Sequence, residues 1–159
     1  MWDLVLQAIN EVAQDNLELG NIDNGISLKV FVSTSMSVSL LKNYGDMAKK
    51  YGAVLVLNGL PEGSWSSLSN LIYELNRDKQ EDDHISLQID DTAFDEYGIT
   101  RVPTIVLAKE KSIFEDDNNK EAVFDKIAGN IGIRRALEEF AAKGRLQEEA
   151  TGILEQSGR

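Results

Sequence analysis

The chain has 159 residues, of which 42% are hydrophobic and 27% charged, a composition typical of one globular domain with a sizeable core. Its 16 basic and 27 acidic residues give a net charge of −11, which repels phosphate backbones and anionic lipids and disfavours nucleic-acid or membrane-surface roles. The chain contains no cysteine, which excludes disulfides, thiolate metal sites and thiol-based catalysis.

The N-terminal part of the chain predicts an amphipathic helix over residues 2–16, because its apolar residues recur at helical spacing. We expect this helix to pack on the rest of the chain, with docking to a partner as the alternative. The Gly- and Asn-rich segment 20–25 separates an arm of residues 1–24 from the main domain of residues 25–144. Residues 1–27 carry five acidic residues and no Lys or Arg, unlike a signal peptide.

The main domain alternates predicted strands and helices. Strands are expected at 28–32, 53–57, 85–89, 104–108 and 122–127. Helices are expected at 37–51, at 64–77, after Asp90 as far as Gly98, and from Asn130 to Gly144. In the helix at 64–77, Trp65 and Leu68 are expected to face inward. A weaker helix or tail follows at 145–159, and polar loops are expected at 78–83 and 115–119. The βαβ crossover predicts a parallel strand pair and the later hairpin an antiparallel pair. We therefore expect an α/β domain whose central mixed sheet has helices on both faces, as in thioredoxin-like proteins.

A proline motif strengthens this reading. The segment from Tyr97 through Pro103 to Ile105 resembles the thioredoxin segment in which a cis-proline precedes a core strand. Proline is the residue for which a cis bond costs little, and at the start of a strand it removes no ladder hydrogen bond. The sequence therefore predicts a cis Val102–Pro103 bond. Gly129, at the end of the last strand, fits the same pattern.

Four motifs in order along residues 28 to 145, the last of which lies within the proline segment, resemble those of the TrbC-type pilin assembly proteins of F-type conjugative type IV secretion systems. They are Phe31-Val32-Ser33-Thr34-Ser35-Met36-Ser37, Val56-Leu57-Asn58-Gly59-Leu60, Ile89-Asp90-Asp91-Thr92-Ala93-Phe94 and Gly98-Ile99-Thr100-Arg101-Val102-Pro103. Thr34 stands where that family has an aromatic residue, Ser37 and Asp91 replace prolines, and Asn58 replaces an arginine. The resemblance implies a periplasmic protein, here without its signal peptide, that supports pilin assembly through other envelope proteins of the apparatus.

The position of the redox site in active thioredoxin-like enzymes holds Met36-Ser37-Val38-Ser39 in this chain. A serine hydroxyl cannot form a mixed disulfide, so we expect a redox-inactive binding module and no enzyme. The edge of the fold that presents backbone to clients in active relatives supplies the expected partner-binding residues. These are Met36, Ser37, Val38, Ser39, Val102 and Pro103.

The sequence also allows two other functions. A hydrolase could work from the Ser33–Ser39 loop, although the single histidine, His84, comes with no Gly-x-Ser-x-Gly motif. A purely structural thioredoxin-like domain of an envelope complex is a second alternative. His84 alone and the acidic run 115–119 lack the ligand spacing of zinc or EF-hand calcium sites, so we expect no metal, and no motif indicates a cofactor.

Overall fold

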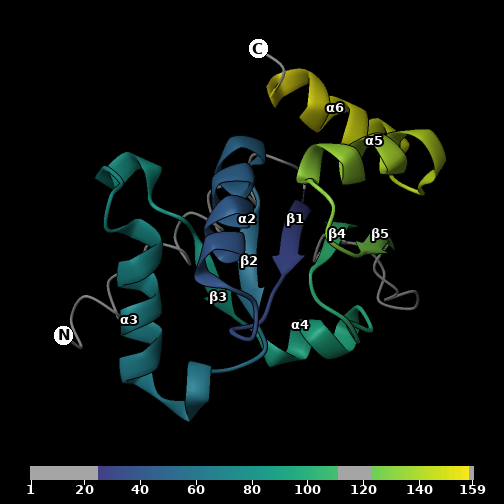
Figure 1. Cartoon of the computed structure of the whole chain (residues 1–159). Coiled ribbons are helices and arrows are strands. Elements are labelled where there is room, and N and C mark those ends of the chain that lie inside the picture. Colours follow the sequence, from purple (N-terminus) through teal and green to yellow (C-terminus); the bar gives the residue numbers. More distant parts are fainter. Residues whose placement is uncertain (1–24, 111–122, 158–159) are drawn as a thin grey trace.

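The structure is a computed structural model that describes residues 25–110 and 123–157 (Figure 1). The predicted helix at 2–16 and the predicted acidic loop at 115–119 lie outside the described residues. The strands are β1 (Ile26–Phe31), β2 (Val54–Leu57), β3 (Leu87–Ile89), β4 (Thr104–Lys109) and β5 (Val123–Ala128). The α-helices are α2 (Val38–Tyr51), α3 (Trp65–Asn76), α4 (Asp91–Glu96), α5 (Ile133–Lys143) and α6 (Gln147–Ser157), and 3₁₀ turns cover Pro61–Gly63 and Glu81–Asp83.

The five strands form one mixed sheet in the order β3-β2-β1-β4-β5. β1 runs parallel to β2, and β2 runs parallel to β3. β4 returns antiparallel to β1 and then pairs with β5, so that Val30 lies between Leu55 and Ile105. This arrangement confirms the predicted mixed α/β sheet and is compatible with a thioredoxin-like fold.

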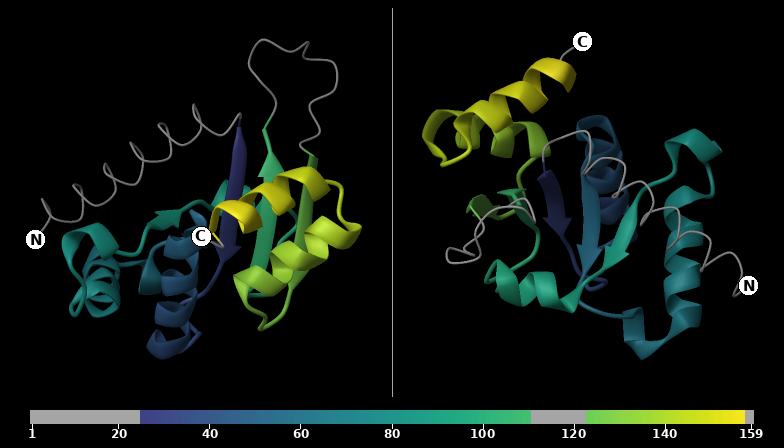
Figure 2. Two further views of the ribbon diagram at one scale, coloured as in Figure 1. Left: turned by 90° about the horizontal axis from the view of Figure 1, so that it is seen from above. Right: turned by 180° about the vertical axis from the view of Figure 1, so that it is seen from behind.

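The alternation of side chains along the strands divides the core into two clusters. On one face, strand residues such as Val30, Leu55 and Leu107 pack against α2, α3, α5 and α6. On the other face, Phe31, Val56 and Val106 pack against α4. Figures 1 and 2 show α2 lying over the first face, with α5 and α6 beside it. Helices on both faces were predicted, and the described residues confirm it.

Three of the predicted helix starts are confirmed by the hydrogen bonds of their caps. Ser37 Oγ accepts from the Leu40 amide at 3.1 Å, Ser64 Oγ from Ser67 at 3.3 Å, and Asp90 Oδ1 from Ala93 at 3.0 Å. These bonds satisfy amides that have no partner within the first helical turn. The predicted cis Val102–Pro103 bond and the left-handed Gly98 (φ +61°) are also present.

Two predictions about helix starts were wrong. Asn130 does not cap α5, which begins after Gly132; its Oδ1 instead accepts a hydrogen bond of 3.0 Å from the hydroxyl of Tyr44. Trp65 does not face inward, because 40% of it is exposed whereas Leu68 is buried. Side chains in a helix pack over the turn that precedes them, and Trp65, as the first residue of α3, has no preceding turn of this helix to pack on.

Candidate functional site

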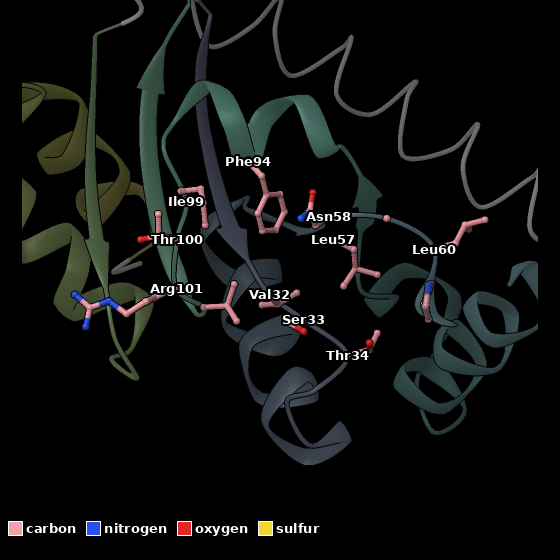
Figure 3. A pocket seen from close by; sticks show the side chains of 13 residues that line it. Val32, Ser33, Thr34, Leu57, Asn58, Leu60, Phe94, Ile99, Thr100 and Arg101 are labelled. Atoms are coloured by element: carbon pink, nitrogen blue, oxygen red, sulfur yellow. The ribbon is translucent and has the colours of Figure 1, made fainter. Parts of the chain in front are cut away.

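An open cavity of about 370 Å³ lies where β1 and β2 end (Figure 3). Its walls come from four short chain segments: one after β1, one at the end of β2, one at Phe94 in α4 and one at residues 99–102, before β4. The lining residues are Val32, Ser33, Thr34, Leu57, Asn58, Gly59, Leu60, Pro61, Phe94, Ile99, Thr100, Arg101 and Val102. The carboxyl ends of parallel strands meet at one edge of a sheet, a common place for binding sites in α/β folds.

Apolar and polar residues contribute to the lining in similar measure. Phe94, Ile99 and Leu57 supply aromatic and aliphatic surface, while Thr34 and Thr100 are exposed hydroxyl-bearing residues. The lining residues include one cation, Arg101, whose guanidinium points away from the other lining side chains in Figure 3. They include no carboxylate, although the chain as a whole carries a charge of −11.

The segment between α4 and β4 is held at both of its ends. At its start, the Ile99 amide donates to the Phe94 carbonyl at 2.8 Å, which closes the end of α4. At its end, Thr104 Oγ1 donates to the Arg101 carbonyl at 2.6 Å beside the cis Val102–Pro103 bond. The backbone N–H and C=O groups of Thr100 and Val102, which lie between these anchors, take part in none of the described hydrogen bonds.

The hydroxyls of the serine loop serve the local backbone. Ser33 Oγ accepts from the Ser35 amide at 3.1 Å and lies 2.9 Å from Ser35 Oγ, and Ser37 caps α2. Among the described hydrogen bonds, none joins the hydroxyl of Ser33, Ser35, Ser37 or Ser39 to a histidine, lysine or carboxylate. A nucleophilic serine needs such a base, so the geometry gives the hydrolase reading no support.

The six predicted binding residues occupy different environments. Val102 is half-buried and lines the cavity, whereas Pro103 is buried. Ser37, Val38 and Ser39 are exposed at the start of α2.

Met36 differs from the expectation of an exposed contact. It is half-buried and packs against the larger core cluster, because the turn from Ser33 to α2 folds its side chain back onto the domain. Part of its surface is therefore already used for packing.

The binding prediction missed most of the residues around the cavity, among them Asn58, Gly59, Leu60 and Arg101. The signal that could have found them was present in the sequence. Every lining residue except Pro61 belongs to one of the four motifs that carry the family resemblance. The fold brings these four motifs together around one cavity.

Burial changes the pKa of Tyr97, which follows α4. Tyr97 packs edge-on against Phe31 and Phe124, with ring centroids 6.0 Å and 4.9 Å apart. Burial, together with the nearby carboxylates of Glu96, Glu110 and Asp90, raises the pKa of Tyr97 to about 12. The phenol therefore stays neutral at physiological pH.

Within residues 25–110 and 123–157, no group of three or more His, Asp or Glu side chains is arranged to hold a metal ion, and His84 is exposed. No helix in these same ranges is long and apolar enough to cross a bilayer.

Comparison with known proteins supports the resemblance read from the motifs. The sequence profile of the type-F conjugative transfer system pilin assembly proteins matches residues 30–140, more than half of the chain. The chain belongs to this TrbC family. The match confirms the predicted family and its setting in conjugation and type IV secretion.

One relative of the chain is the periplasmic protein TrbC of Escherichia coli (strain K12), which is 28% identical over 128 residues. The alignment covers 80% of this chain and 54% of that protein, so the chain spans about half the length of this relative. The predicted periplasmic location agrees with the location given in the relative's name. No solved structure matches the chain.

Proposed function

We propose that this protein is a redox-inactive thioredoxin-like module that supports pilin assembly by binding other envelope proteins of a conjugative type IV secretion system in the periplasm. The observation that carries the proposal is the convergence of the four family motifs on one open cavity. Some motif residues, such as Phe31 and Val56, belong to the core, but others, such as Thr34 and Thr100, are exposed around the cavity, which favours a binding role over a purely structural one.

The chemistry of the site favours binding over catalysis. The chain has no thiol for disulfide exchange, and Met36 and Ser39 stand where active relatives carry cysteines. Nearby, the hydroxyls of Ser33 and Ser35 lie 2.9 Å apart, and that of Ser37 caps α2. We therefore propose that the module is no enzyme.

The proposed binding face consists of the 33–39 loop, the cavity and the segment from Thr100 to Pro103. The backbone groups of Thr100 and Val102, which make none of the described hydrogen bonds, can pair with an extended partner segment. Ser37, Val38 and Ser39 offer further exposed contacts beside it. The partners are proteins, because the charge of −11 opposes binding to nucleic acid.

The test replaces exposed rim residues with a bulky side chain. Thr34→Trp and Thr100→Trp should leave the thermal melt unchanged but fail to restore pili to cells that lack the gene. Thr92→Trp is the matched control, since Thr92 is exposed on α4 and does not line the cavity. Normal pili with both rim variants would contradict the proposal.

A further inference from the structure

We propose that Asn58 and Gly59, which follow β2 and line the cavity, form a site of spontaneous deamidation that converts Asn58 into a carboxylate. Such a covalent change to the cavity lining is separate from partner binding. The proposal rests on the exposure of the two residues, on their freedom from other contacts and on the charge of the lining around them.

Asn58 and Gly59 are free of the hydrogen bonds that would hold them in place. Both are exposed where the chain bends between β2 and the 3₁₀ turn at Pro61–Gly63. Neither the side chain of Asn58 nor the backbone amide of Gly59 takes part in any of the described hydrogen bonds. A Cβ added at Gly59 meets no atom within 4 Å. The Gly59 nitrogen is therefore unbonded and unhindered beside the Asn58 side chain.

Deamidation at such a pair needs only water and the chain itself. The Gly59 nitrogen attacks Cγ of Asn58, so that an N–Cγ bond forms and the Cγ–Nδ2 bond breaks, and ammonia leaves with the proton of the Gly59 amide. Water then opens the succinimide ring that has formed. Cleavage of its N–Cγ bond gives Asp, whereas cleavage of the bond from the nitrogen to the backbone carbonyl carbon gives isoaspartate.

The other asparagines in the described part of the chain lack this combination of features. Asn43 and Asn70 are exposed, but they lie inside α2 and α3, where the next backbone amide is bonded along the helix. The side-chain oxygens of Asn76 and Asn130 accept hydrogen bonds of 2.7 Å and 3.0 Å. Among the described asparagines, Asn58 is therefore the one placed to react.

The product changes the charge of the cavity lining. The lining residues include one cation, Arg101, and no carboxylate. Asp and isoaspartate are both ionised at neutral pH, so either product places a negative charge among the lining residues. Isoaspartate also lengthens the main chain just ahead of Leu60 and Pro61, which line the cavity as well.

The measurement is peptide mapping by mass spectrometry after the full chain has been incubated in mildly alkaline buffer. We expect progressive loss of the unmodified Asn58 peptide and the appearance of its Asp and isoaspartate forms, with no change at Asn43 or Asn70. The map separates Asn58 from Asn24, which precedes Gly25 and lies outside the described residues.

Gly59→Val keeps Asn58 but shields the attacking nitrogen with a branched side chain. It should fold normally, because Gly59 has open surroundings and no positive φ, and it should keep Asn58 intact. Gly152→Val is the matched control, since Gly152 has the same open surroundings on α6 and does not line the cavity. Thermal melts check the fold of both variants. An unreactive Asn58, or conversion as fast in Gly59→Val as in the unmodified chain, would overturn the proposal.

An effect of the modification on assembly rests on the proposed function. If the cavity binds a partner, Asn58→Asp should restore fewer pili than Asn58→Gln, which keeps a neutral amide. Conversion of Asn58 with equal numbers of pili from the two variants would confirm the modification and contradict the proposed binding role of the cavity. An unreactive Asn58 with fewer pili from Asn58→Asp would overturn the modification and leave the proposed function standing.

Discussion

The ammonium group of Lys126 donates hydrogen bonds to the backbone carbonyls of Tyr97 and Gly98, at 2.9 Å and 3.1 Å. Lys126 lies on β5, whereas the two carbonyls follow α4 directly before the segment that lines the cavity. Carbonyls at a helix end lack partners within the helix, and a cation there also complements the helix dipole. The edge strand therefore fixes the start of the cavity wall.

Replacing Lys126 with Met should loosen this wall while keeping the aliphatic length of the side chain. We expect the free energy of unfolding to fall by about 1 kcal/mol, because a charge-assisted hydrogen bond at a partly exposed site is lost. Lys109→Met is the control: Lys109 is exposed on neighbouring β4 and makes none of the described side-chain hydrogen bonds. Urea unfolding measures both variants, and equal stabilities would show that the Lys126 contacts contribute nothing.

The adjacent residue, Asp125, holds the start of α6. Its carboxylate accepts from the amides of Arg145 at 2.8 Å and Leu146 at 2.9 Å. Asp125→Ala should lower the free energy of unfolding by about 1–2 kcal/mol, as loss of a helix cap does. Asp95→Ala removes an exposed carboxylate from α4 and should change stability little. Hydrogen exchange should show faster opening of α6 in Asp125→Ala alone; unchanged exchange there would refute the capping role.

Two glycines in helices should respond to alanine with opposite signs. A Cβ at Gly45 would lie 2.7 Å from Cγ1 and 2.8 Å from Cγ2 of Ile85, so Gly45→Ala should destabilise by about 1–3 kcal/mol through overpacking. A Cβ at Gly152 meets nothing within 4 Å, and Gly152→Ala should stabilise α6 by up to about 1 kcal/mol. Thermal melts compare the two variants. A stabilising Gly45→Ala would mean that α2 and Ile85 are not in close contact.

Alkaline pH should destabilise the protein through Tyr97. Its pKa is raised from 10.0 to about 12, so the unfolded chain releases the phenolic proton at a lower pH than the folded chain does. The free energy of unfolding is therefore unaffected below pH 10 and falls as the pH rises from about 10 to about 12, by up to about 2 kcal/mol.

Tyr97→Phe has no phenol to ionise and should lose this part of the fall. Tyr73→Phe is the control, because Tyr73 is 64% exposed, and its dependence on pH should match that of the unmodified chain. Chemical unfolding at several pH values supplies the comparison. Parallel curves for the unmodified chain and Tyr97→Phe would show that ionisation of Tyr97 is not linked to folding.

Local patterns in the sequence were sufficient to predict most of the fold. The apolar run at Val54–Leu57 predicted a buried strand, and Ser37, Ser64 and Asp90 marked helix starts, because both signals act over a few residues. Asn130 carried the same capping signal, but its side chain binds Tyr44, which is 86 residues away in the sequence. Such a long-range contact leaves no local trace.

The candidate site was predicted less completely. Val102 was found because the proline motif marks it, whereas Asn58 and Gly59 come from the end of a different strand. The sheet order β3-β2-β1-β4-β5 brings these segments together, and this order depends on packing rather than on any short motif. Met36 was expected on the surface, but it is half-buried because the turn before α2 folds back onto the core. The sequence does not show this path of the turn.

Photo-crosslinking during pilus assembly tests the central claim most directly. A photoreactive phenylalanine analogue is placed at Thr34 on the cavity rim or, as the control, at the exposed Tyr73 on α3, and adducts are identified in cells that are assembling pili. The account predicts adducts from position 34 with pilin or another apparatus protein, lost when Thr100→Trp obstructs the rim of the cavity. Adducts from position 73 alone, with none from position 34, would contradict it.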